Sequence, residues 1–215
     1  KTTNATIANA ICFKNVLLTR NLIMLMLVIA ISACQKTGNN TASLSNKKVP
    51  KIFNKVPSSQ SGIDFVNTIE NTEKMNIFSY RNFYNGGGVA IGDIDNDGLP
   101  DLYFISNLKE NKLYKNKGNF QFDDITPTAK VKGTFGWSTG VTMADVNADG
   151  WLDIYVSKSG KGKAQNRANE LFINNGDLTF TEKADAYNLA ENGLTTHAAF
   201  FDYDKDGDLD VYILN

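Results

Sequence analysis

Short apolar segments rich in β-branched and aromatic residues recur along the chain from residue 88 onward, and such segments are typical of buried strands. Three of them directly follow stretches of aspartate and glycine, at residues 102–105, 154–156 and 211–214. Three further segments of small and apolar residues precede the same stretches, at residues 88–92, 140–144 and 197–201. Small residues suit a strand that packs close to its neighbours. The pattern therefore predicts an all-β fold in which strand, acidic turn and strand repeat.

A second pair of strands is predicted in the repeating unit. Residues 111–122 and 169–180 share the same order of polar and apolar positions around an Asn/Gly turn, which indicates a β-hairpin. One unit therefore contains about four short strands. The first aspartates of the acidic stretches, Asp93, Asp145 and Asp202, lie 52 and then 57 residues apart. Four strands and one loop in a period of this size predict a β-propeller, whose blades bury their faces against one another.

Residues 64–84 lie before the first acidic stretch and are longer than the matching part of the later repeats. The segment contains a cluster of aromatic residues, Phe78, Tyr80, Phe83 and Tyr84. We expect an elaborated hairpin of the first blade, with these aromatic side chains packed in the core. A surface on which sugars stack is the alternative.

The acidic stretches share one nine-residue pattern, D-x-[DN]-x-D-G-x-x-D, at residues 93–101, 145–153 and 202–210. Oxygen ligands at positions 1, 3, 5 and 9 and the backbone carbonyl of position 7 can converge on one ion, and glycine at position 6 allows the sharp turn. Hard oxygen ligands suit Ca²⁺, and the loops contain no Cys or His for zinc or copper. The predicted ligands are Asp93, Asp95, Asp97, Leu99 and Asp101, then Asp145, Asn147, Asp149, Trp151 and Asp153, then Asp202, Asp204, Asp206, Asp208 and Asp210.

Two other structures have loops of similar composition, the EF-hand and a turn that binds no metal. An EF-hand needs Glu at position 12 and a following helix, whereas this chain has Phe104, Val156 and Ile213 there, each in a predicted strand. An Asp/Asn/Gly turn that binds nothing is plausible for one copy. Three copies with the same ligand spacing favour a metal site. The close carboxylates also favour it, because they repel one another without a cation. The ion can still be purely structural, as a cross-link of a strand turn.

The segment from Asn67 onward, including NGGGVAIGDIDNDGLPDLYF and FFDYDKDGDLDVY, resembles the FG-GAP/VCBS repeats of integrin-α-type β-propellers. It is similar to bacterial VCBS-repeat lipoproteins, which often carry a C-terminal ASPIC/UnbV segment. The resemblance covers about residues 53–215 and implies that the Asp and Asn side chains of the loops bind calcium. It also implies a propeller of about seven blades. We expect about three of them here, in an incomplete domain, because the third repeat stops at Asn215 after its post-loop strand.

The N-terminal region predicts export. An apolar run of ten residues, 22–31, follows Lys14 and Arg20; it is too short to span a membrane but fits a secretory signal. Ile31-Ser-Ala-Cys34 resembles a bacterial lipobox, in which the cysteine is lipidated. A buried helix with an incidental Cys34 is the alternative. We expect a signal peptide with lipobox at 1–34, a disordered tether at 35–61 and the propeller at 62–215. This organisation predicts a lipoprotein of a bacterial outer membrane or cell surface, held to the membrane through its lipid alone.

The composition narrows the function. The net charge of −1 argues against a nucleic-acid partner, and twelve of the 23 acidic residues lie in the three loops. No catalytic residues are predicted, since no nucleophile, zinc-protease or phosphate-binding motif occurs, and the single histidine, His197, is expected to be a strand residue. Two functions stay open. One is a non-catalytic adhesion module for an unknown protein or glycan ligand, and the other is the N-terminal propeller of a larger polysaccharide-active enzyme. A structural spacer is a third possibility.

Overall fold

The computed structural model describes residues 51–134, 136–161 and 163–215. Residues 55–215 form one compact unit, and the fold is given for this unit by itself. The predicted signal peptide with Cys34, and residues 35–50 of the predicted tether, lie outside the described residues. Among the described residues, no helix has the length and apolar character needed to cross a membrane.

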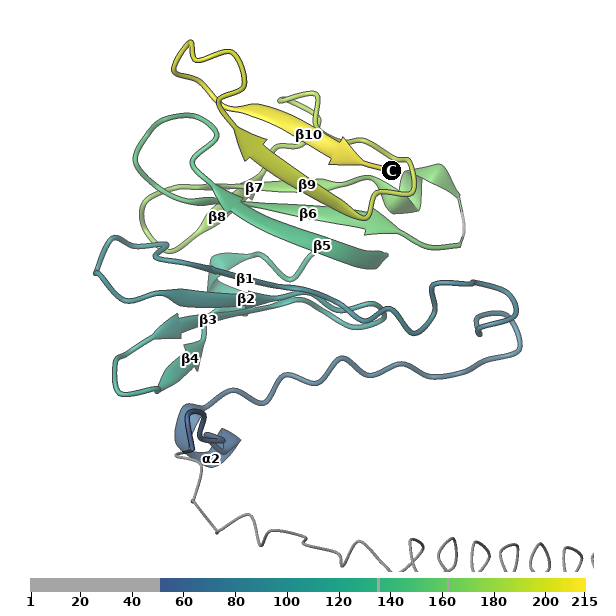
Figure 1. Ribbon diagram of the computed structural model, residues 1–215, viewed down its shortest axis with the longest axis horizontal. Helices are drawn as coiled ribbons and strands as arrows, with labels where there is room; N and C mark the ends of the chain where they lie inside the picture. The colour runs from purple at the N-terminus through teal and green to yellow at the C-terminus, as the bar shows by residue number, and fades with distance from the viewer. Residues whose placement is uncertain (1–50, 135, 162) are drawn as a thin grey trace, which may run out of the picture. The chain divides into compact units, whose positions relative to one another are not determined.

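The described part of the unit contains three antiparallel sheets in which the strands follow sequence order (Figure 1). The first sheet consists of β1 (Val89–Gly92), β2 (Asp101–Phe104), β3 (Lys112–Asn116) and β4 (Phe122–Asp124). The second consists of β5 (Trp137–Ala144), β6 (Asp153–Ser159), β7 (Glu170–Asn174) and β8 (Phe180–Glu182). The third consists of β9 (His197–Phe201) and β10 (Asp210–Leu214). The predicted all-β fold built of propeller blades is confirmed, with four strands in each of the first two sheets and two in the third.

Each acidic stretch connects the first strand of a sheet to the second. The strand pairs close at Gly92 with Asp101, Ala144 with Asp153 and Phe201 with Asp210. Position 9 of every loop is therefore the first residue of the second strand and lies opposite the residue that precedes position 1. The predicted hairpins at 111–122 and 169–180 are also present, as the β3–β4 and β7–β8 pairs.

The second sheet is buried on both faces. Along β6, Ile154 and Val156 contribute to one apolar cluster and Tyr155 to another, as expected when successive side chains point to opposite faces. The first cluster joins the first two sheets: Ala90, Ile94, Tyr103, Ile105, Leu113, Ala129, Val131, Val141, Ile154, Val156, Phe172 and Phe180. The second cluster joins the second and third sheets: Tyr155, Leu171, Ile173, Ala184 and Ala198.

The first strands of the three sheets are neighbours in space, with β5 in contact with both β1 and β9 (Figure 1). Their small residues permit this approach: a Cβ added at Gly140 of β5 would come within 2.5 Å of the carbonyl oxygen of Thr196. A face-to-face stack of sheets with their first strands side by side is the arrangement of propeller blades around an axis.

Residues 64–84 differ from the predicted elaborated hairpin, because the structure assigns them turns and bends and no strand. The side chain of Asn76 explains the difference, since its Oδ1 accepts the N–H groups of Phe78 and Ser79, each at 3.0 Å, and such bonds compete with a β ladder. The predicted core packing of the aromatic side chains is confirmed for Phe83, which is fully buried. It is wrong for Phe78, which is 99% exposed.

Ordered packing reaches into residues 55–61, the C-terminal end of the predicted tether. Helix α2 (Ser58–Ser61) follows Pro57, whose carbonyl oxygen accepts the N–H groups of Gln60 and Ser61 at 3.0 Å. A Cβ added at Gly62 would lie 2.4 Å from the carbonyl oxygen of Phe122 in β4. Glycine is needed there because the segment approaches the first sheet so closely, and its φ of 76° is also in the left-handed region. Helices α3 (Thr126–Ala129) and η1 (Ala164–Arg167) lie in connections between strands.

Three residues of the difference between the two repeat periods, 52 and 57, lie in connections at the end of the blades away from the acidic loops. The β2–β3 connection spans residues 105–111, whereas the β6–β7 connection spans residues 160–169 and includes η1. Since β2 and β6 both start at an acidic loop, these two connections lie at the opposite end of their strands.

Candidate metal centres in the acidic loops

The aspartate at position 1 holds the turn of each loop closed. In the first loop, Asp93 Oδ1 accepts the N–H of Asp97 at 3.1 Å and Oδ2 accepts the N–H of Gly98 at 2.8 Å. Asp145 repeats both bonds in the second loop, at 3.0 and 2.8 Å. Asp202 accepts the N–H of the loop glycine in the third, at 3.3 Å. These bonds explain why a short acidic side chain starts the pattern.

Two positions of each loop have left-handed backbone. The glycines at position 6 have φ values of 84°, 90° and 98°, as expected for a sharp turn. Position 4 is left-handed as well, with φ of 57° at Asn96, 59° at Ala148 and 65° at Lys205. Position 4 carries no common sequence signal, because only Asn96 is a residue type that favours this region.

Position 9 is bound to backbone on two sides. Asp101 is fully buried, and its Oδ2 accepts the N–H of Ile94 at 3.0 Å while its Oδ1 accepts the N–H of Asn116 at 2.7 Å. Asp153 makes the equivalent pair of bonds in the second blade, at 3.0 and 2.8 Å. Burial raises the pKa of both carboxyl groups above the usual value, although the N–H donors act in the opposite direction. Position 9 therefore joins the loop to the third strand of its blade, in addition to the predicted ligand role.

Position 7 lies beside the carboxylate of position 5. The N–H groups of Leu99, Trp151 and Asp208 donate to the side chains of Asp97, Asp149 and Asp206, at 2.9, 2.9 and 3.1 Å. The hydrogen bond from the Asp208 backbone lowers the pKa of Asp206, and the neighbouring Asp206 carboxyl raises that of Asp208. In the third loop, Asp210 accepts the N–H of Tyr203 at 2.9 Å, as position 9 does in the other loops.

The structure brings several predicted ligands together. Carboxylate oxygens of Asp93, Asp95 and Asp101 lie within 4.8 Å of one another in the first loop, and those of Asp202, Asp204 and Asp206 do so in the third. Among the described residues, the second loop has no such trio of carboxylates, because its position 3 is Asn147, which accepts the N–H of Asp149 at 3.2 Å. The donors are oxygen atoms throughout, which is the set that Ca²⁺ prefers.

Asp95 supplies an independent sign of a cation. Its Oδ1 is buried and has no hydrogen-bond partner among the residues that the structure describes. A buried carboxylate oxygen without a donor is unfavourable, and this atom belongs to one of the converging carboxylates. The residues present in the first loop therefore fit a hard divalent cation such as Ca²⁺.

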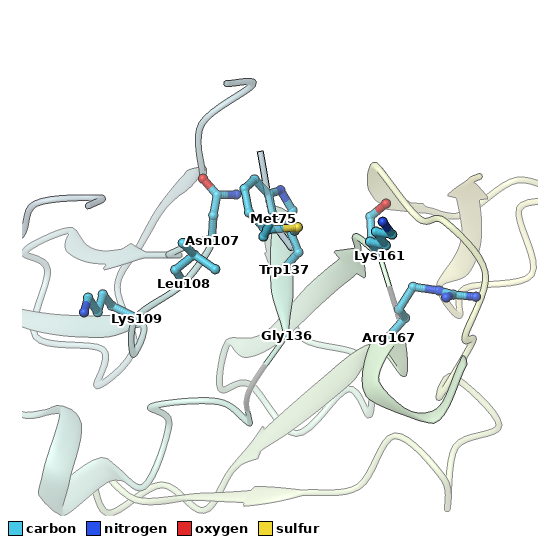
Figure 2. A pocket seen from close by; sticks show the side chains of 9 residues that line it. Met75, Asn107, Leu108, Lys109, Gly136, Trp137, Lys161 and Arg167 are labelled. Carbon is cyan, nitrogen blue, oxygen red and sulfur yellow. The ribbon is translucent and has the colours of Figure 1, made fainter. Parts of the chain in front are cut away.

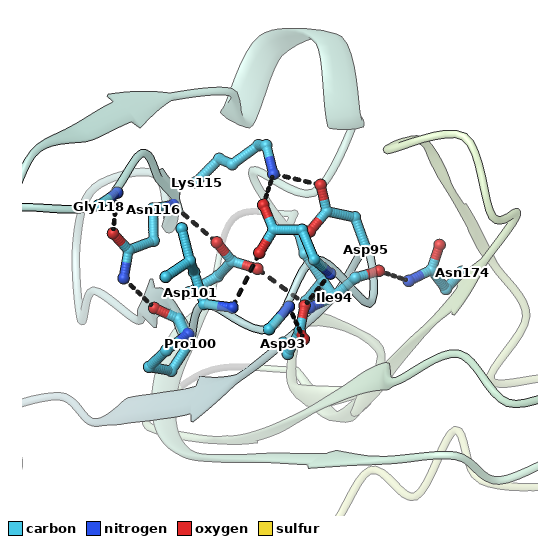
Figure 3. Close-up of polar contacts among 12 residues, drawn as sticks. Asp93, Ile94, Asp95, Pro100, Asp101, Lys115, Asn116, Gly118 and Asn174 are labelled. Carbon is cyan, nitrogen blue, oxygen red and sulfur yellow. Dashed lines mark hydrogen bonds and ion pairs between the residues drawn. The ribbon is translucent and has the colours of Figure 1, made fainter.

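A lysine that sequence reasoning missed also contacts the first loop. Figure 3 shows Lys115 of β3 reaching the side chain of Asp95 and, at 2.7 Å, that of Asp97. The hydrogen bond from Lys115 lowers the pKa of Asp97. Partial burial acts to lower the pKa of Lys115 itself, but its bonds to the two carboxylates outweigh burial and the pKa lies above its ordinary value. The loop pattern gave no sign of this residue, since it lies fourteen residues beyond Asp101 on another strand.

The first loop is hydrogen-bonded to the second blade. Asn96 Nδ2 donates to the carbonyl oxygen of Gly150 in the second loop at 3.1 Å. Asn174 Nδ2 donates to the carbonyl oxygen of Ile94 at 2.8 Å (Figure 3) and also to that of Leu152 at 3.1 Å. Asparagine side chains therefore join neighbouring blades through backbone carbonyl groups of the loops, and we expect a change in one loop to alter the position of the next blade.

A pocket of about 200 Å³ lies at the other end of the strands. Its lining includes Trp137, which is 3% exposed and whose Nε1 has no acceptor among the described residues. Figure 2 shows Lys109 on one side of Trp137, and Lys161 and Arg167 on the other. The three cationic groups therefore surround the pocket without converging on one point. His197 lies in β9 opposite Leu214, in the strand position that the sequence predicted.

The four-stranded antiparallel sheets, packed face to face with an acidic loop after each first strand, define a β-propeller type of blade. The pattern of the FG-GAP-like repeat matches residues 93–156 and 162–213, and the chain belongs to this family. The matched residues begin at the first aspartate of the first loop and include all three loops.

The chain is also similar to cartilage acidic protein 1. Identity to the protein of Xenopus tropicalis is 32% over 139 residues, which is 62% of this chain and 20% of that protein. Identity to the protein of Mus musculus is 28% over 130 residues, 60% of this chain and 20% of that protein. The Homo sapiens protein is 28% identical over 134 residues, 61% of this chain and 20% of that protein. The chain thus spans about a fifth of the length of these curated relatives.

Proposed function

We propose that the repeats belong to a calcium-binding β-propeller that acts as a non-catalytic module for binding a protein or glycan. The observation that carries the proposal is the convergence of carboxylate oxygens in the first and third loops within 4.8 Å, together with the orphaned oxygen of Asp95. The FG-GAP-like repeat match supports it, because these repeats build propellers and commonly hold calcium in such loops. Ca²⁺ would be held by the predicted ligands of the three loops and would neutralise carboxylates that otherwise repel one another.

Thermal melting with calcium and with EGTA tests the calcium assignment. A ligand that binds the folded state alone stabilises it by mass action, about 2.7 kcal/mol at a hundredfold excess over Kd. For a protein of this size that corresponds to a rise in Tm of roughly 5–10 °C. Equal melting temperatures in the two buffers would reject calcium binding, and Mg²⁺ at the same concentration controls for ionic strength.

The charge around the pocket beside Trp137 supports a recognition role. Residues 51–215 contain all 23 acidic residues of the chain, but none of these residues lines the pocket. Lys109 and Lys161 are exposed and make no ion pair within the described residues. A cationic patch on an otherwise acidic unit suits a ligand that carries carboxylates or sulfates. Binding to arrays of acidic and neutral glycans would test this preference, and preference for neutral glycans would contradict it.

We further propose that the protein is exported and anchored by a lipid, as a bacterial lipoprotein of the VCBS-repeat, ASPIC/UnbV type at the outer membrane or cell surface. The support is the order of charge, apolar run and lipobox in residues 1–34, with Cys34 as the lipidated residue and the segment that precedes the compact unit as tether. The propeller would begin at residue 62 and close with about seven blades. Replacing Cys34 by Ser should release the protein from the membrane fraction, and retention there would count against lipidation.

The alternative proposal is that the repeats are the N-terminal propeller of a larger polysaccharide-active enzyme, with a catalytic region beyond this sequence. Assays of the full gene product against polysaccharides distinguish the two proposals. Release of oligosaccharides favours the enzyme, and binding without release favours the recognition module.

A further inference from the structure

The first acidic loop already contains a cation from the protein itself. Lys115 Nζ lies between the carboxylates of Asp95 and Asp97, which are positions 3 and 5 of the predicted calcium loop (Figure 3). The side chains of the trio are 23%, 18% and 35% exposed, so the contact is partly shielded from solvent. Partial shielding strengthens an ion pair relative to one on an open surface.

The second blade has no such lysine. In the strand register, Lys115 of β3 lies opposite Asp123 of β4. The equivalent residue of the second blade is Ile173 of β7, which lies opposite Thr181 of β8. Ile173 is 8% exposed and belongs to the apolar cluster between the second and third sheets. The second loop therefore has no internal ammonium at this position.

The loops also differ at position 3. The first loop has Asp95 where the second has Asn147, so the pair Asp95 and Lys115 stands in place of the pair Asn147 and Ile173. The additional carboxylate and the additional ammonium thus occur together in the first blade and are both replaced in the second.

An ammonium and a divalent cation compete for the same carboxylates. Ca²⁺ in the first loop needs oxygens of positions 3 and 5, and Lys115 donates to one oxygen of each. Two cations a few ångströms apart repel strongly in a partly shielded site. Asp95 Oδ1 stays free for a metal, but charge repulsion opposes binding of the metal for as long as the lysine remains in place.

We propose that Lys115 is a built-in competitor of the divalent cation in the first loop, so that this loop binds Ca²⁺ more weakly than the second and is held together by the lysine when calcium is low. The inference rests on the proposed calcium-binding function. It implies that the loops fill in order as calcium rises, the second before the first.

Calorimetric titration of the protein with CaCl₂ tests the competition. Lys115→Met keeps the aliphatic stem and removes the charge, and it should tighten one class of sites by roughly tenfold or more. Lys115→Arg keeps the charge and should leave that class weak. Lys117→Met is the matched control, because Lys117 lies on the same hairpin and pairs with Asp123 rather than with the loop. Unchanged affinities in Lys115→Met, with calcium still bound, would overturn the inference.

Terbium luminescence separates this outcome from failure of the proposed function. Trp151 is position 7 of the second loop, but Asn96 of the first loop donates to the neighbouring Gly150, so tryptophan can sensitise terbium in both loops. Asp149→Ala removes a predicted ligand of the second loop alone, and the emission lost in that variant is the second-loop signal. We expect the second-loop signal to be the same in the wild type and in Lys115→Met. No terbium or calcium binding at any loop would reject the proposed function itself, whereas binding at the second loop with no effect of Lys115→Met would reject only the competition.

Melting without metal tests whether Lys115 holds the first loop together when calcium is low. In EGTA, Lys115→Met should lower Tm by roughly 2–4 °C, because it leaves Asp95 and Asp97 unpaired. The double variant Asp95→Asn/Lys115→Ile recreates the pair of the second blade and should recover most of that loss. An unchanged Tm for Lys115→Met in EGTA would show that the lysine does not hold the loop.

Discussion

The aspartate at position 9 is a predicted metal ligand and also a hydrogen-bond acceptor that joins the loop to the third strand of its blade. The loop pattern does not distinguish these two roles. Asp101 and Asp153 are buried and each accepts two backbone N–H groups, one from the loop and one from the third strand of its blade. Asp149 at position 5 is exposed, and within the described part of the chain it accepts bonds from its own loop alone. The two aspartates of the second loop should therefore respond differently when calcium is removed.

The prediction at this scale compares two alanine substitutions. Asp153→Ala should destabilise the protein by roughly 2–4 kcal/mol in EGTA as well as in calcium, because it leaves two N–H groups without their charged acceptor. Asp149→Ala should change stability little in EGTA and lose part of the gain from calcium. Urea unfolding in both buffers measures the effects. Equal losses for the two variants in EGTA would contradict the structural role of Asp153.

The chemistry of the first loop also shows what a single sequence conceals at the residue scale. The spacing of Asp93, Asp95 and Asp101 was enough to place three oxygens together. The contact of Lys115 was not predictable, because it depends on the register that brings β3 beside the loop. The predicted metal ligands lie close together in the sequence, whereas the lysine that competes for them is close to them only in the folded structure.

At the scale of elements, a buried ion pair ties the second blade to the segment that enters it. Lys158 Nζ of β6 lies 2.8 Å from Glu170 Oε2 of β7, and the side chains are 1% and 6% exposed. Both also bond Thr134, which donates its N–H to Glu170 Oε1 at 2.7 Å and accepts from Lys158 at 2.6 Å through its hydroxyl. The apolar residues around these strands were readable from the sequence, but the pairing of two charged residues from neighbouring strands was not.

We expect either half of this pair to be costly to remove alone. Lys158→Met or Glu170→Gln should each destabilise the protein by about 3–5 kcal/mol, because a buried charge is left without its partner. The double variant should lose clearly less than the sum of the two. Guanidinium unfolding of the four proteins gives the coupling energy, and strictly additive losses would show that the pair does not act as a unit.

Over the whole unit, the three sheets depend on one another. Both faces of the second sheet are buried, whereas Ile91 of the first sheet and Tyr212 of the third are 64% and 63% exposed. Each apolar cluster takes side chains from two sheets, so no sheet has a core of its own. The sequence predicted this dependence from the repeat period and the continuous apolar strands, and it could not predict the turn-rich path of residues 64–84, which side-chain bonds from Asn76 decide.

Unfolding should therefore be cooperative across the blades. Leu113→Ala in the first cluster and Leu171→Ala in the second should each cost about 2–5 kcal/mol. Either change should shift a single transition, with circular dichroism and tryptophan fluorescence melting together. A separate early transition in only one probe would indicate blades that unfold independently.

The uneven lengths of the β2–β3 and β6–β7 connections have a consequence for engineering. The acidic end of each blade is held by loop residues whose backbone bonds repeat from blade to blade, so an inserted residue there would break several bonds at once. The other end already accommodates seven residues in one blade, 105–111, and ten in the next, 160–169. Foreign peptides should therefore be grafted into this connection at the exposed Lys163, so that Lys161 and Arg167 of the pocket and the buried Asn169 are kept.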